Sequence, residues 1–540
     1  MAKKETLTAQ KRYDWYKEAK TLSDSWKSRL DQAYRFIIPN RSDFFNKSVP
    51  RDSELQIFDS TAVEASLDFA NNIQTILMPP FTRWASMTAG DVVNKSETIS
   101  DAEKKQIDEE LQNQTEILFN HFNQSNLTLM VNVAFQDMSI STGVMFLNEG
   151  PDENPLEFLT VPLSAIVFDQ GISGRLENFW REWEIEARKI PQKWPKAELP
   201  SRLQSQIKNS PEAKIQLIEG TIFLADNDPE YQWLYYVQLV EGPEDIFWEF
   251  REFSPFIGFR FNVGPGEVYG RGPGMNLTPK IRVLNKTIES QLRVADFIAH
   301  PVFLVDNNGV VNVHNMTIEA GSILVVEPTL SGKDPIRPMK FDGNLQFLEL
   351  SIKQMQEEIR NGFFADPLPP PSQSPTKTAT EVSIRQQEWI RKSAASFGRL
   401  TKELLEPILD KSIRILRKKN ILKDIEMSDG MLTLELDKKN INIKYNSPLL
   451  DIQNKEDVNN LQQYIAFLAN DFGPLGISAS LKLPEIPKWV AERLRIDMKL
   501  INSPTQVQEK FAQMQQAQQQ QQAQQQPQPQ APAQPGAAVT

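Results

Sequence analysis

Cysteine is absent from this chain of 540 residues, and the only histidines are His121, His300 and His314. Without cysteine there is no disulfide scaffold, no cysteine-ligated zinc or iron–sulfur cluster, and no cysteine nucleophile. The three histidines are scattered, and no two have the spacing that places metal ligands on one helix face. We therefore expect a protein without a metal or other cofactor, and one that is not an enzyme.

Long apolar runs are also missing. The longest, such as Ile323–Val326 and Val302–Val305, fall far short of the ~18 residues that a bilayer span needs. The first residues, MAKKETLTAQKRYDWYKEAK, lack the apolar core of a signal peptide. The sequence predicts no membrane span and no secretory leader.

No nucleotide-binding motif is complete. The glycine-rich segment Gly264–Gly274 has neither the P-loop pattern nor the G-x-G-x-x-G spacing, and Gly332-Lys333 lacks the upstream glycine of a P-loop. We interpret the segment as a turn before a helix. Asp226-Asn227-Asp228 resembles the start of a calcium loop, but Tyr231 stands where an EF-hand needs glycine. These patterns favour neither an ATPase nor a cation site.

Basic residues are fewer than acidic ones, 59 against 70, which gives a formal net charge of −11. An acidic balance argues against broad, tight, nonspecific binding to DNA, but it suits a protein past which DNA has to slide. Hydrophobic residues make up 40% of the chain, as in ordinary globular proteins, and the length allows several domains.

The first half of the chain combines helical and strand-like patterns, so we expect Met1–Phe261 to be a large α+β body. Thr61 and Glu64 have the form of a capping box. The predicted helices are Thr6–Tyr34, Ile57–Met78, about Ser100–Asn123, Leu127–Ser141 and part of Ile190–Ser210. The predicted strands are Leu156–Val161, Phe179–Ile185, Ile215–Leu224, Trp233–Leu239 and Ile246–Phe253. The predicted core aromatics are Trp180, Trp183, Trp233 and Trp248.

A hairpin between two helices follows. The first helix is predicted at about Thr278–Ala299 and the second at about Asn344–Gly362. Between them Val302–Val305 and Val310–His314 flank Asp306–Gly309, and Asn-Gly between apolar runs is a strong hairpin signal. The same region has a predicted strand Ile323–Glu327 and a predicted loop Gly332–Pro338.

A proline-rich loop and a long helix come next. Ala365–Thr376 (ADPLPPPSQSPT) cannot be regular helix or central strand. The helix predicted at Thr378–Asn420 has Pro407 as a kink or break. Ile421–Ile501 is predicted to be a small α/β part, and the Gln-rich end from Thr505 to be disordered.

The long helix is strongly basic, and two interpretations of that charge are open. Its cations could contact phosphates, or they could pair with an acidic surface of the same protein. We favour pairing, because charged helix faces are usually solvated or paired. The cations are Arg385, Arg391, Lys392, Arg399, Lys402, Lys411, Arg414, Arg417, Lys418 and Lys419.

The order of these segments resembles the head-to-tail connector, or portal, family of short-tailed podovirus-type bacteriophages. The resemblance extends from Lys11 to about Gln526 and rests on the joint order of short stretches. In the first half they are Tyr34–Pro39, Phe58–Ala62 and Met78–Trp84. In the second half they are Tyr269–Gly272 before a helix with Leu284-Asn285, Thr378–Val382 with Arg385, Leu404–Leu409, and Ser503-Pro504 before Val507–Glu509. Gly272-Pro273-Gly274 departs from the family, which usually has serine and then an apolar residue there.

The resemblance implies a portal-type α+β fold built from named parts. The body would be the wing, and two stem helices would flank a β-hairpin clip. A tunnel loop and a long kinked helix across the wing would follow, and then a crown and a disordered tail. The implied ranges are wing 1–277, stem helix 278–299, clip 300–343, second stem helix 344–362, tunnel loop 363–377, long wing helix 378–420, crown 421–504 and tail 505–540.

Two groups of site residues follow from the resemblance. Small, neutral or proline residues of the tunnel loop would line the narrowest part of a DNA channel, with Lys377 as the one basic side chain. The exposed clip would dock partners. The channel residues are Pro369, Pro370, Pro371, Ser372, Gln373, Ser374, Thr376 and Lys377. The clip residues are Val302, Leu304, Asp306, Asn307, Asn308, Val310, Val311 and His314.

The implied function is that of a ring, normally of twelve copies, at one vertex of the capsid of the virion. Genomic double-stranded DNA would enter through it during packaging and leave through it at infection. Its partners would be copies of itself, the terminase large subunit, a tail adaptor, the major capsid and scaffolding proteins, and internal core proteins; assembly would take place in the host cytoplasm. The alternative is a structural adaptor or scaffold of a virion that never forms a channel. An enzyme ranks last.

Overall fold

The computed structural model describes residues 7–40, 57–90, 101–225, 227–299, 303–305, 336–338, 345–365, 395–426, 433–434, 441–445, 448–494, 496, 507 and 510. The chain forms two compact units. One consists of Met1–Phe81 and Leu118–Leu422, and the other of Thr82–Ile117 and Lys423–Thr540. Both mix helices and strands, which confirms the α+β class. Residues 82–117, predicted as part of the wing, therefore group with the C-terminal part of the chain.

Three N-terminal helices of the first unit lie close to their predicted bounds: α1 Ala9–Ile37, α2 Thr61–Leu77 and α5 Leu127–Ile140. The hydroxyl of Thr8 caps α1 by accepting from the amide of Lys11. The capping box predicted at Thr61 and Glu64 is wrong. Ser60 is the residue before α2, and the amide of Thr61 donates instead to Oδ1 of Asp59 at 3.0 Å.

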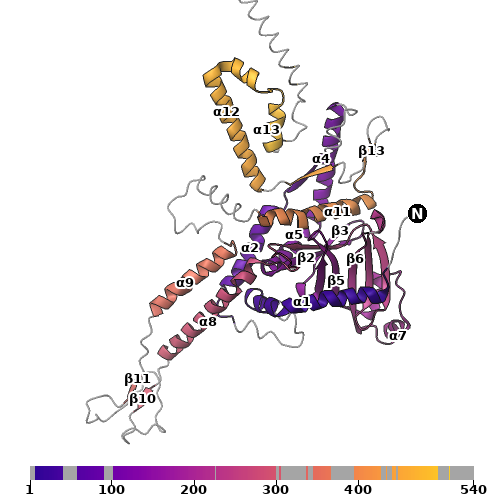
Figure 1. Cartoon of the computed structure of the whole chain (residues 1–540), viewed down its shortest axis with the longest axis vertical. Helices are drawn as coiled ribbons and strands as arrows, with labels where there is room; N and C mark the ends of the chain where they lie inside the picture. Colours follow the sequence, from indigo (N-terminus) through magenta and orange to yellow (C-terminus); the bar gives the residue numbers. More distant parts are fainter. Residues whose placement is uncertain are drawn as a thin grey trace, which may run out of the picture. The chain divides into compact units, whose positions relative to one another are not determined.

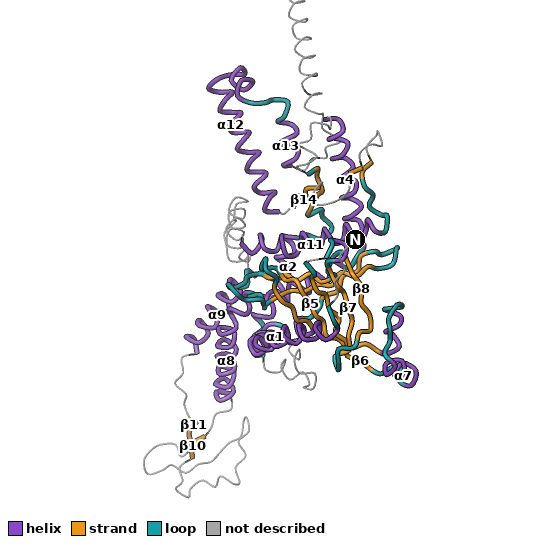
Figure 2. Tube along the Cα trace, turned by 45° about the vertical axis from the view of Figure 1, so that its right-hand side comes forward, coloured by secondary structure: helices purple, strands orange, loops and turns teal. Residues whose placement is uncertain are grey.

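Two antiparallel sheets form the strand-rich part of this unit (Figure 2). The smaller has the order β3-β2-β9 and the larger the order β4-β5-β6-β7-β8. Each of the five strands predicted between Leu156 and Phe253 is present, whereas β2, β4 and β9 were not predicted. The smaller sheet consists of β2 Thr142–Glu149, β3 Leu156–Thr160 and β9 Phe256–Arg260. The larger consists of β4 Ile166–Gln170, β5 Leu176–Glu186, β6 Lys214–Phe223, β7 Trp233–Leu239 and β8 Asp245–Arg251.

The larger sheet is covered on both faces. Helix α1 lies across one face (Figure 1). There Tyr16 packs with the buried Trp180 and Tyr236. The short helices α6 Ile190–Lys193 and α7 Ser201–Asn209 cover the other. Of the four predicted core tryptophans, Trp180 is fully buried, and Trp183 and Trp233 are half-buried. The prediction for Trp248 is wrong, because its side chain is 49% exposed.

The two helices predicted to form the stem, called the stem helices below, are α8 Pro273–Ala299 and α9 Leu345–Gly362. Helix α8 begins five residues before its predicted start. The three-residue strands β10 Phe303–Val305 and β11 Ile336–Pro338 pair antiparallel. The loop predicted at Gly332–Pro338 therefore contains a strand. The rest of the predicted hairpin, and the predicted strand Ile323–Glu327, lie outside the described residues.

The described part of the long helix runs from residue 395 to Lys418, with α11 at Glu406–Lys418. Its middle, Thr401–Leu405, is a π-helical turn directly before the predicted break at Pro407. Residues 378–394 lie outside the described part.

In the second unit, β1 Ala85–Ala89 pairs with β14 Ile441–Tyr445, and β12 Ile425–Glu426 pairs with β13 Thr433–Leu434. Two helices follow, α12 Pro448–Ser480, which bends at Gly473, and α13 Ile486–Leu494. Helix α4, Asp101–Gln124, contributes its residues up to Ile117. Of the described helices, none is both long and apolar enough to cross a membrane. The predicted tail, residues 505–540, lies outside the described part except for residues 507 and 510.

Candidate functional site at the base of the stem

The two stem helices pack side by side (Figures 1 and 2). Lys280 of α8 forms an ion pair with Glu358 of α9, and hydrogen bonding from Lys280 lowers the pKa of the Glu358 carboxyl. Apolar side chains fill the base of the pair. The buried ones are Ile281 and Leu284 of α8 and Ile352 and Ile359 of α9.

The loop before α2 holds both stem helices. The amide of Phe58 donates to Oδ1 of Asn285 on α8 at 2.8 Å. Nε2 of Gln356 on α9 donates to Oδ2 of Asp59 at 2.7 Å. Two stretches that carried the family resemblance, Phe58–Ala62 and Leu284-Asn285, thus meet at this point.

The glycine-rich segment brings the chain from β9 into α8 by close backbone packing. The amide of Gly270 donates to Oγ1 of Thr142 at 2.9 Å, and the amide of Gly272 donates to the carbonyl of Ile140 at 2.9 Å. A Cβ on Gly272 would lie 2.2 Å from the carbonyl oxygen of Ser139. Glycine is required here because two backbone segments touch, and the segment is the turn before a helix that the sequence predicts.

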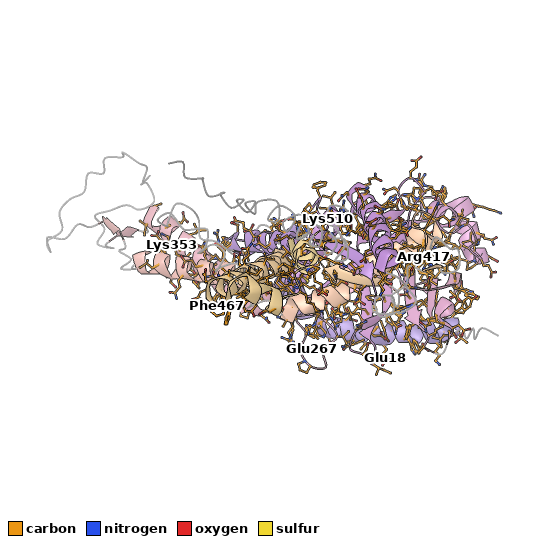
Figure 3. The ribbon with its side chains drawn as sticks, turned by 90° about the horizontal axis from the view of Figure 1, so that it is seen from above. Glu18, Glu267, Lys353, Arg417, Phe467 and Lys510 are labelled. Carbon is orange, nitrogen blue, oxygen red and sulfur yellow. The ribbon has the colours of Figure 1, made fainter. Side chains whose placement is uncertain are left out.

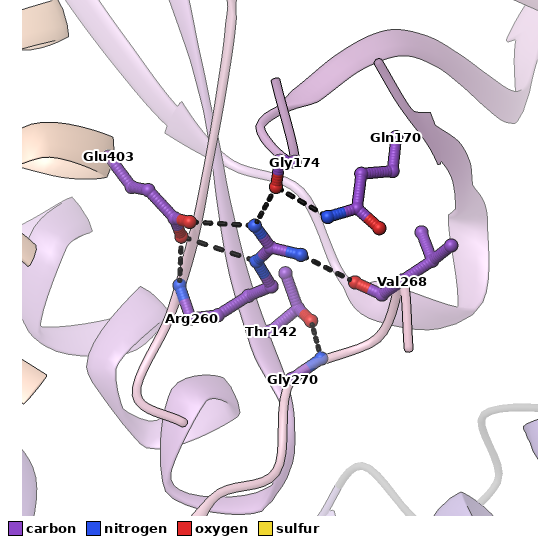
Figure 4. Close-up of polar contacts among 7 residues, drawn as sticks. All are labelled: Thr142, Gln170, Gly174, Arg260, Val268, Gly270 and Glu403. Atoms are coloured by element: carbon purple, nitrogen blue, oxygen red, sulfur yellow. Dashed lines mark hydrogen bonds and ion pairs between the residues drawn. The ribbon is translucent and has the colours of Figure 1, made fainter. Parts of the chain in front are cut away.

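A buried ion pair joins the end of β9 to the long helix (Figure 4). Nη2 of Arg260 lies 2.7 Å from Oε1 of Glu403, and the side chains are only 2% and 9% exposed. The Arg260 amide and Nε both donate to Oε2 of Glu403, at 3.0 and 3.3 Å. The guanidinium also donates to the carbonyls of Val268 (3.0 Å) and Gly174 (2.9 Å). Such extensive pairing is what allows two charges to be buried together.

Glu403 lies within the π-helical turn. The amide of Glu406 donates to the carbonyl of Thr401, five residues back instead of four. Pro407 accounts for this geometry, because proline has no N–H for the Glu403 carbonyl and its ring would clash with that carbonyl in an α-turn. Short π-turns inside α-helices are rare and frequent at functional sites.

Phe261, the residue directly after β9, packs against the end of α9. The ring of Phe261 lies 5.9 Å from that of Phe364 and 5.3 Å from that of Phe69 on α2. Nδ2 of Asn72 donates to the carbonyls of Phe364 and Ala365, at 3.1 and 3.2 Å. Arg260 and Phe261, adjacent in sequence, therefore contact Glu403 on the long helix and Phe364 at the first residues of the predicted tunnel loop. We call Arg260, Phe261, Phe364 and Glu403 the stem junction.

An exposed apolar stripe runs along α8 on the side opposite its buried residues. Val283 and Ile298 at its ends are 56% and 54% exposed, and Val294 between them is half-buried. Thr287 and Ser290 complete the three- and four-residue spacing. Their hydroxyls donate to the carbonyls of Val283 and Lys286, both at 2.9 Å. The stripe is thus a second apolar face of α8, which the described residues of this chain leave exposed.

The cations of the long helix pair with acidic residues of the first unit. Arg414 pairs with Glu252, Lys418 with Glu149 at 2.8 Å, and Lys419 with Asp152 at 2.8 Å. Lys402 pairs with Glu406 along the helix. Hydrogen bonding from Lys419 lowers the pKa of the Asp152 carboxyl. These ion pairs are what the pairing interpretation predicts, and contact with phosphates stays untested; Arg385, Arg391 and Lys392 lie outside the described part.

The predicted site residues are largely beyond the described part of the chain. All eight channel residues, Pro369 to Lys377, lie outside it. Of the clip residues, Leu304 lies in β10, and the other seven lie outside the described residues. The structure therefore does not test whether the channel residues or the clip residues form a site.

No sequence pattern pointed to the stem junction. Glu403 lies among the many cations of a basic helix, and Arg260 ends β9, a strand that was not predicted. Pro407 was the one local signal, since it predicted an irregularity in the helix. Figure 3 labels two other charged residues, Lys353 on α9 and Glu267 in the turn before α8. Among the described residues, no group of three His, Asp or Glu side chains could hold a metal.

Comparison with known proteins gives the family. The family model described as bacteriophage head to tail connecting protein matches residues 9–501. A probable portal protein of Bordetella phage BPP-1 is 22% identical over 533 residues, covering 93% of this chain and 90% of that protein.

Two solved structures of gene transfer agent particles are weakly similar. One is the neck of an empty particle, with 12% identity and a TM-score of 0.35 over 79% of this chain and 90% of that one. The other is a native virion, with the same identity and TM-score over 81% and 93%. The family match, unlike these two, spans nearly the whole chain. The chain belongs to the bacteriophage head-to-tail connecting proteins and has the function of a phage portal.

Proposed function

We propose that copies of this chain close into a ring at one vertex of the phage capsid, through which genomic double-stranded DNA is packaged and later ejected. The observation that carries the proposal is the family match over residues 9–501. In the family the ring normally has twelve copies. The chain itself would catalyse nothing, and a separate terminase motor would supply the work before a tail adaptor replaces it.

The apolar stripe on α8 supports the ring. Identical subunits that close a ring need two different complementary surfaces on each copy. Val283 and Ile298 are exposed apolar side chains, with the half-buried Val294 between them, on a helix whose opposite side carries the buried Ile281 and Leu284. Contiguous apolar surface on a soluble protein commonly marks an interface. We propose that the neighbouring copy covers this stripe.

The charge distribution supports a conduit. DNA that must move should not be held by strong phosphate contacts. The net charge is −11 per copy, and the described cations of the long helix are largely engaged by acids such as Glu149, Asp152 and Glu252. A basic helix that is neutralised in this way would not retain passing phosphates.

The tunnel loop and the clip keep their proposed roles. Deleting Pro369–Ser374 should leave rings intact but let packaged DNA leak from full heads. Replacing Asn307–Gly309 by a longer flexible loop should leave rings intact but block docking of the motor or the tail adaptor. Normal DNA retention would remove the first role, and normal docking would remove the second.

The ring is tested by placing charge on the stripe. Val283→Asp and Ile298→Asp should each leave a folded chain that no longer forms rings, because a carboxylate would be buried at the interface. Ile172→Asp is the matched control, since Ile172 is fully exposed in the turn between β4 and β5. Native mass spectrometry gives the assembly state and circular dichroism the fold. Rings from both stripe variants would exclude the stripe from the interface, and a monomeric unaltered chain across protein and salt concentrations would contradict the ring itself.

A further inference from the structure

We infer that the Arg260–Glu403 ion pair holds the long helix in one rotational register by fixing the π-turn at Thr401–Leu405. The inference deepens the proposed function and rests on it in one respect, namely that the chain before this helix reaches the channel. The register itself is a property of described residues and stands apart from that assumption.

The first step is the geometry of the turn. A π-turn contains one residue more than the α-turn it replaces. If it became α-helical, the helix on one side would rotate by about 100° and move by about 1.5 Å relative to the other side, which is one residue of an α-helix. A turn of this kind can therefore exist in two discrete registers.

The second step is which side would move. The C-terminal side is fixed to the strands, because Nζ of Lys411 donates to the carbonyl of Phe256 at 2.7 Å and Arg414 pairs with Glu252. Nζ of Lys419 also donates to the carbonyl of Gly150 at 2.7 Å. The helical residues 395–400 would move instead. Within this segment Ser396, Phe397 and Leu400 are buried, and Oγ of Ser396 donates to Oδ1 of Asn262, just beyond the end of β9, at 3.1 Å.

The third step is what selects the register. Pro407 disfavours an α-turn at Glu403, but it does not by itself determine where along the helix the π-turn lies. Arg260 does so, since its amide, Nε and Nη2 all bond the Glu403 carboxylate. A shift of the turn would withdraw that carboxylate and leave a buried guanidinium without its countercharge, which is strongly unfavourable.

The consequence is a positioning role for Arg260. With the ion pair in place, Ser396 faces Asn262. If the π-turn became α-helical, residue 397 would take the place of residue 396, and Phe397 would face Asn262. The pair thereby sets the rotation at which the chain enters the long helix from the direction of the predicted tunnel loop.

Engineered cysteines report the register directly, because the chain has none of its own. We would build two full-length reporters, Asn262→Cys with Ser396→Cys and Asn262→Cys with Phe397→Cys. Each is combined with Glu403→Gln, with Arg260→Lys, or with the control Lys402→Gln. Lys402 lies in the same turn but is 62% exposed and pairs only locally with Glu406. Disulfide formation is measured on the isolated chain, with circular dichroism as the check of folding.

In the unaltered background and in the control, we expect the 262–396 pair to cross-link and the 262–397 pair not to. Glu403→Gln and Arg260→Lys should let the 262–397 pair cross-link as well, although Pro407 still disfavours the α-helical turn. Folded variants with an unchanged pattern would overturn the inference, whether or not rings form. Hydrogen exchange on the unsubstituted chain gives a second test. Amides of Leu404–Glu406 should exchange about as slowly as those of α11, and exchange faster by about tenfold or more would show that the ion pair does not hold the turn.

Discussion

At the scale of single residues, Glu403 is expected to matter most for stability. Glu403→Gln leaves the Arg260 guanidinium, only 2% exposed, without a countercharge. Breaking a buried pair by removing one partner costs about 3–5 kcal/mol. We therefore expect a lower midpoint in denaturant unfolding followed by tryptophan fluorescence, with Trp180 as a fully buried reporter in the same unit.

The neighbouring Lys402 provides the control for that measurement. Its pair with Glu406 is largely solvated, and exposed pairs contribute about 0–1 kcal/mol. Lys402→Gln should therefore barely move the midpoint. Equal effects of the two substitutions would mean that burial of the Arg260–Glu403 pair is not what stabilises the junction.

A second residue-scale prediction concerns pH. Hydrogen bonding from Arg271 lowers the pKa of the Glu267 carboxyl from its ordinary 4.5. A carboxyl whose pKa is lower in the folded chain adds stability above its unfolded pKa, and that stability is lost as the pH falls through the folded value. NMR titration should place Glu267 below its ordinary value, and Arg271→Gln should bring it back. If the titration midpoint of Glu267 were unchanged in the Arg271→Gln variant, hydrogen bonding from Arg271 would not be the cause of the lowered pKa.

The sequence reaches some of these residues and not others, for a physical reason. Pro407 acts on its own helix, so its effect on the turn could be predicted from local sequence. Arg260 and Glu403 are 143 residues apart, and neither stands in a pattern that points to the other. A long-range charge pair becomes visible only once the chain has folded, and the same holds for Phe261 against Phe364.

At the scale of elements, the start of α8 depends on Gly272. An added Cβ would lie 2.2 Å from the Ser139 carbonyl oxygen, so Gly272→Ala must push two backbone segments apart. Overpacking of this kind costs about 1–3 kcal/mol. Thermal unfolding should show a lower midpoint for this variant.

Gly398 is the matched glycine for that experiment. It lies in the helical residues 395–400, and an added Cβ there meets nothing within 4 Å. Gly398→Ala should stabilise the helix by about 0.5–1 kcal/mol, since glycine is a poor helix former. A loss of stability at Gly398 as large as that at Gly272 would show that close packing is not why Gly272 is glycine.

Element types could be predicted better than element partners. Alternating and helical patterns located the five predicted strands and most described helices, because those periods follow from local geometry. The pairing of β1 with β14 joins Ala85 to Tyr445, and no local pattern contains that register. The same limit explains why the grouping of residues 82–117 with the C-terminal part of the chain was not predicted.

At the scale of the whole molecule, recognition of the family depended on the order of many short stretches, none sufficient alone. The order of these stretches can be read from the sequence even though individual contacts cannot. The family match from residue 9 to residue 501 confirms the resemblance that was based on this order. The predicted channel residues Pro369–Lys377 stay predictions, since they lie outside the described chain.

Electron microscopy of the purified full-length protein tests the central claim most directly. The account predicts closed rings with an axial hole about as wide as a DNA duplex, and α8 of each copy contacting its neighbour through Val283 and Ile298. A heterologous contact that fails to close gives open filaments instead. Filaments, or particles without an axial hole under every assembly condition, would contradict the claim that this chain forms a DNA channel.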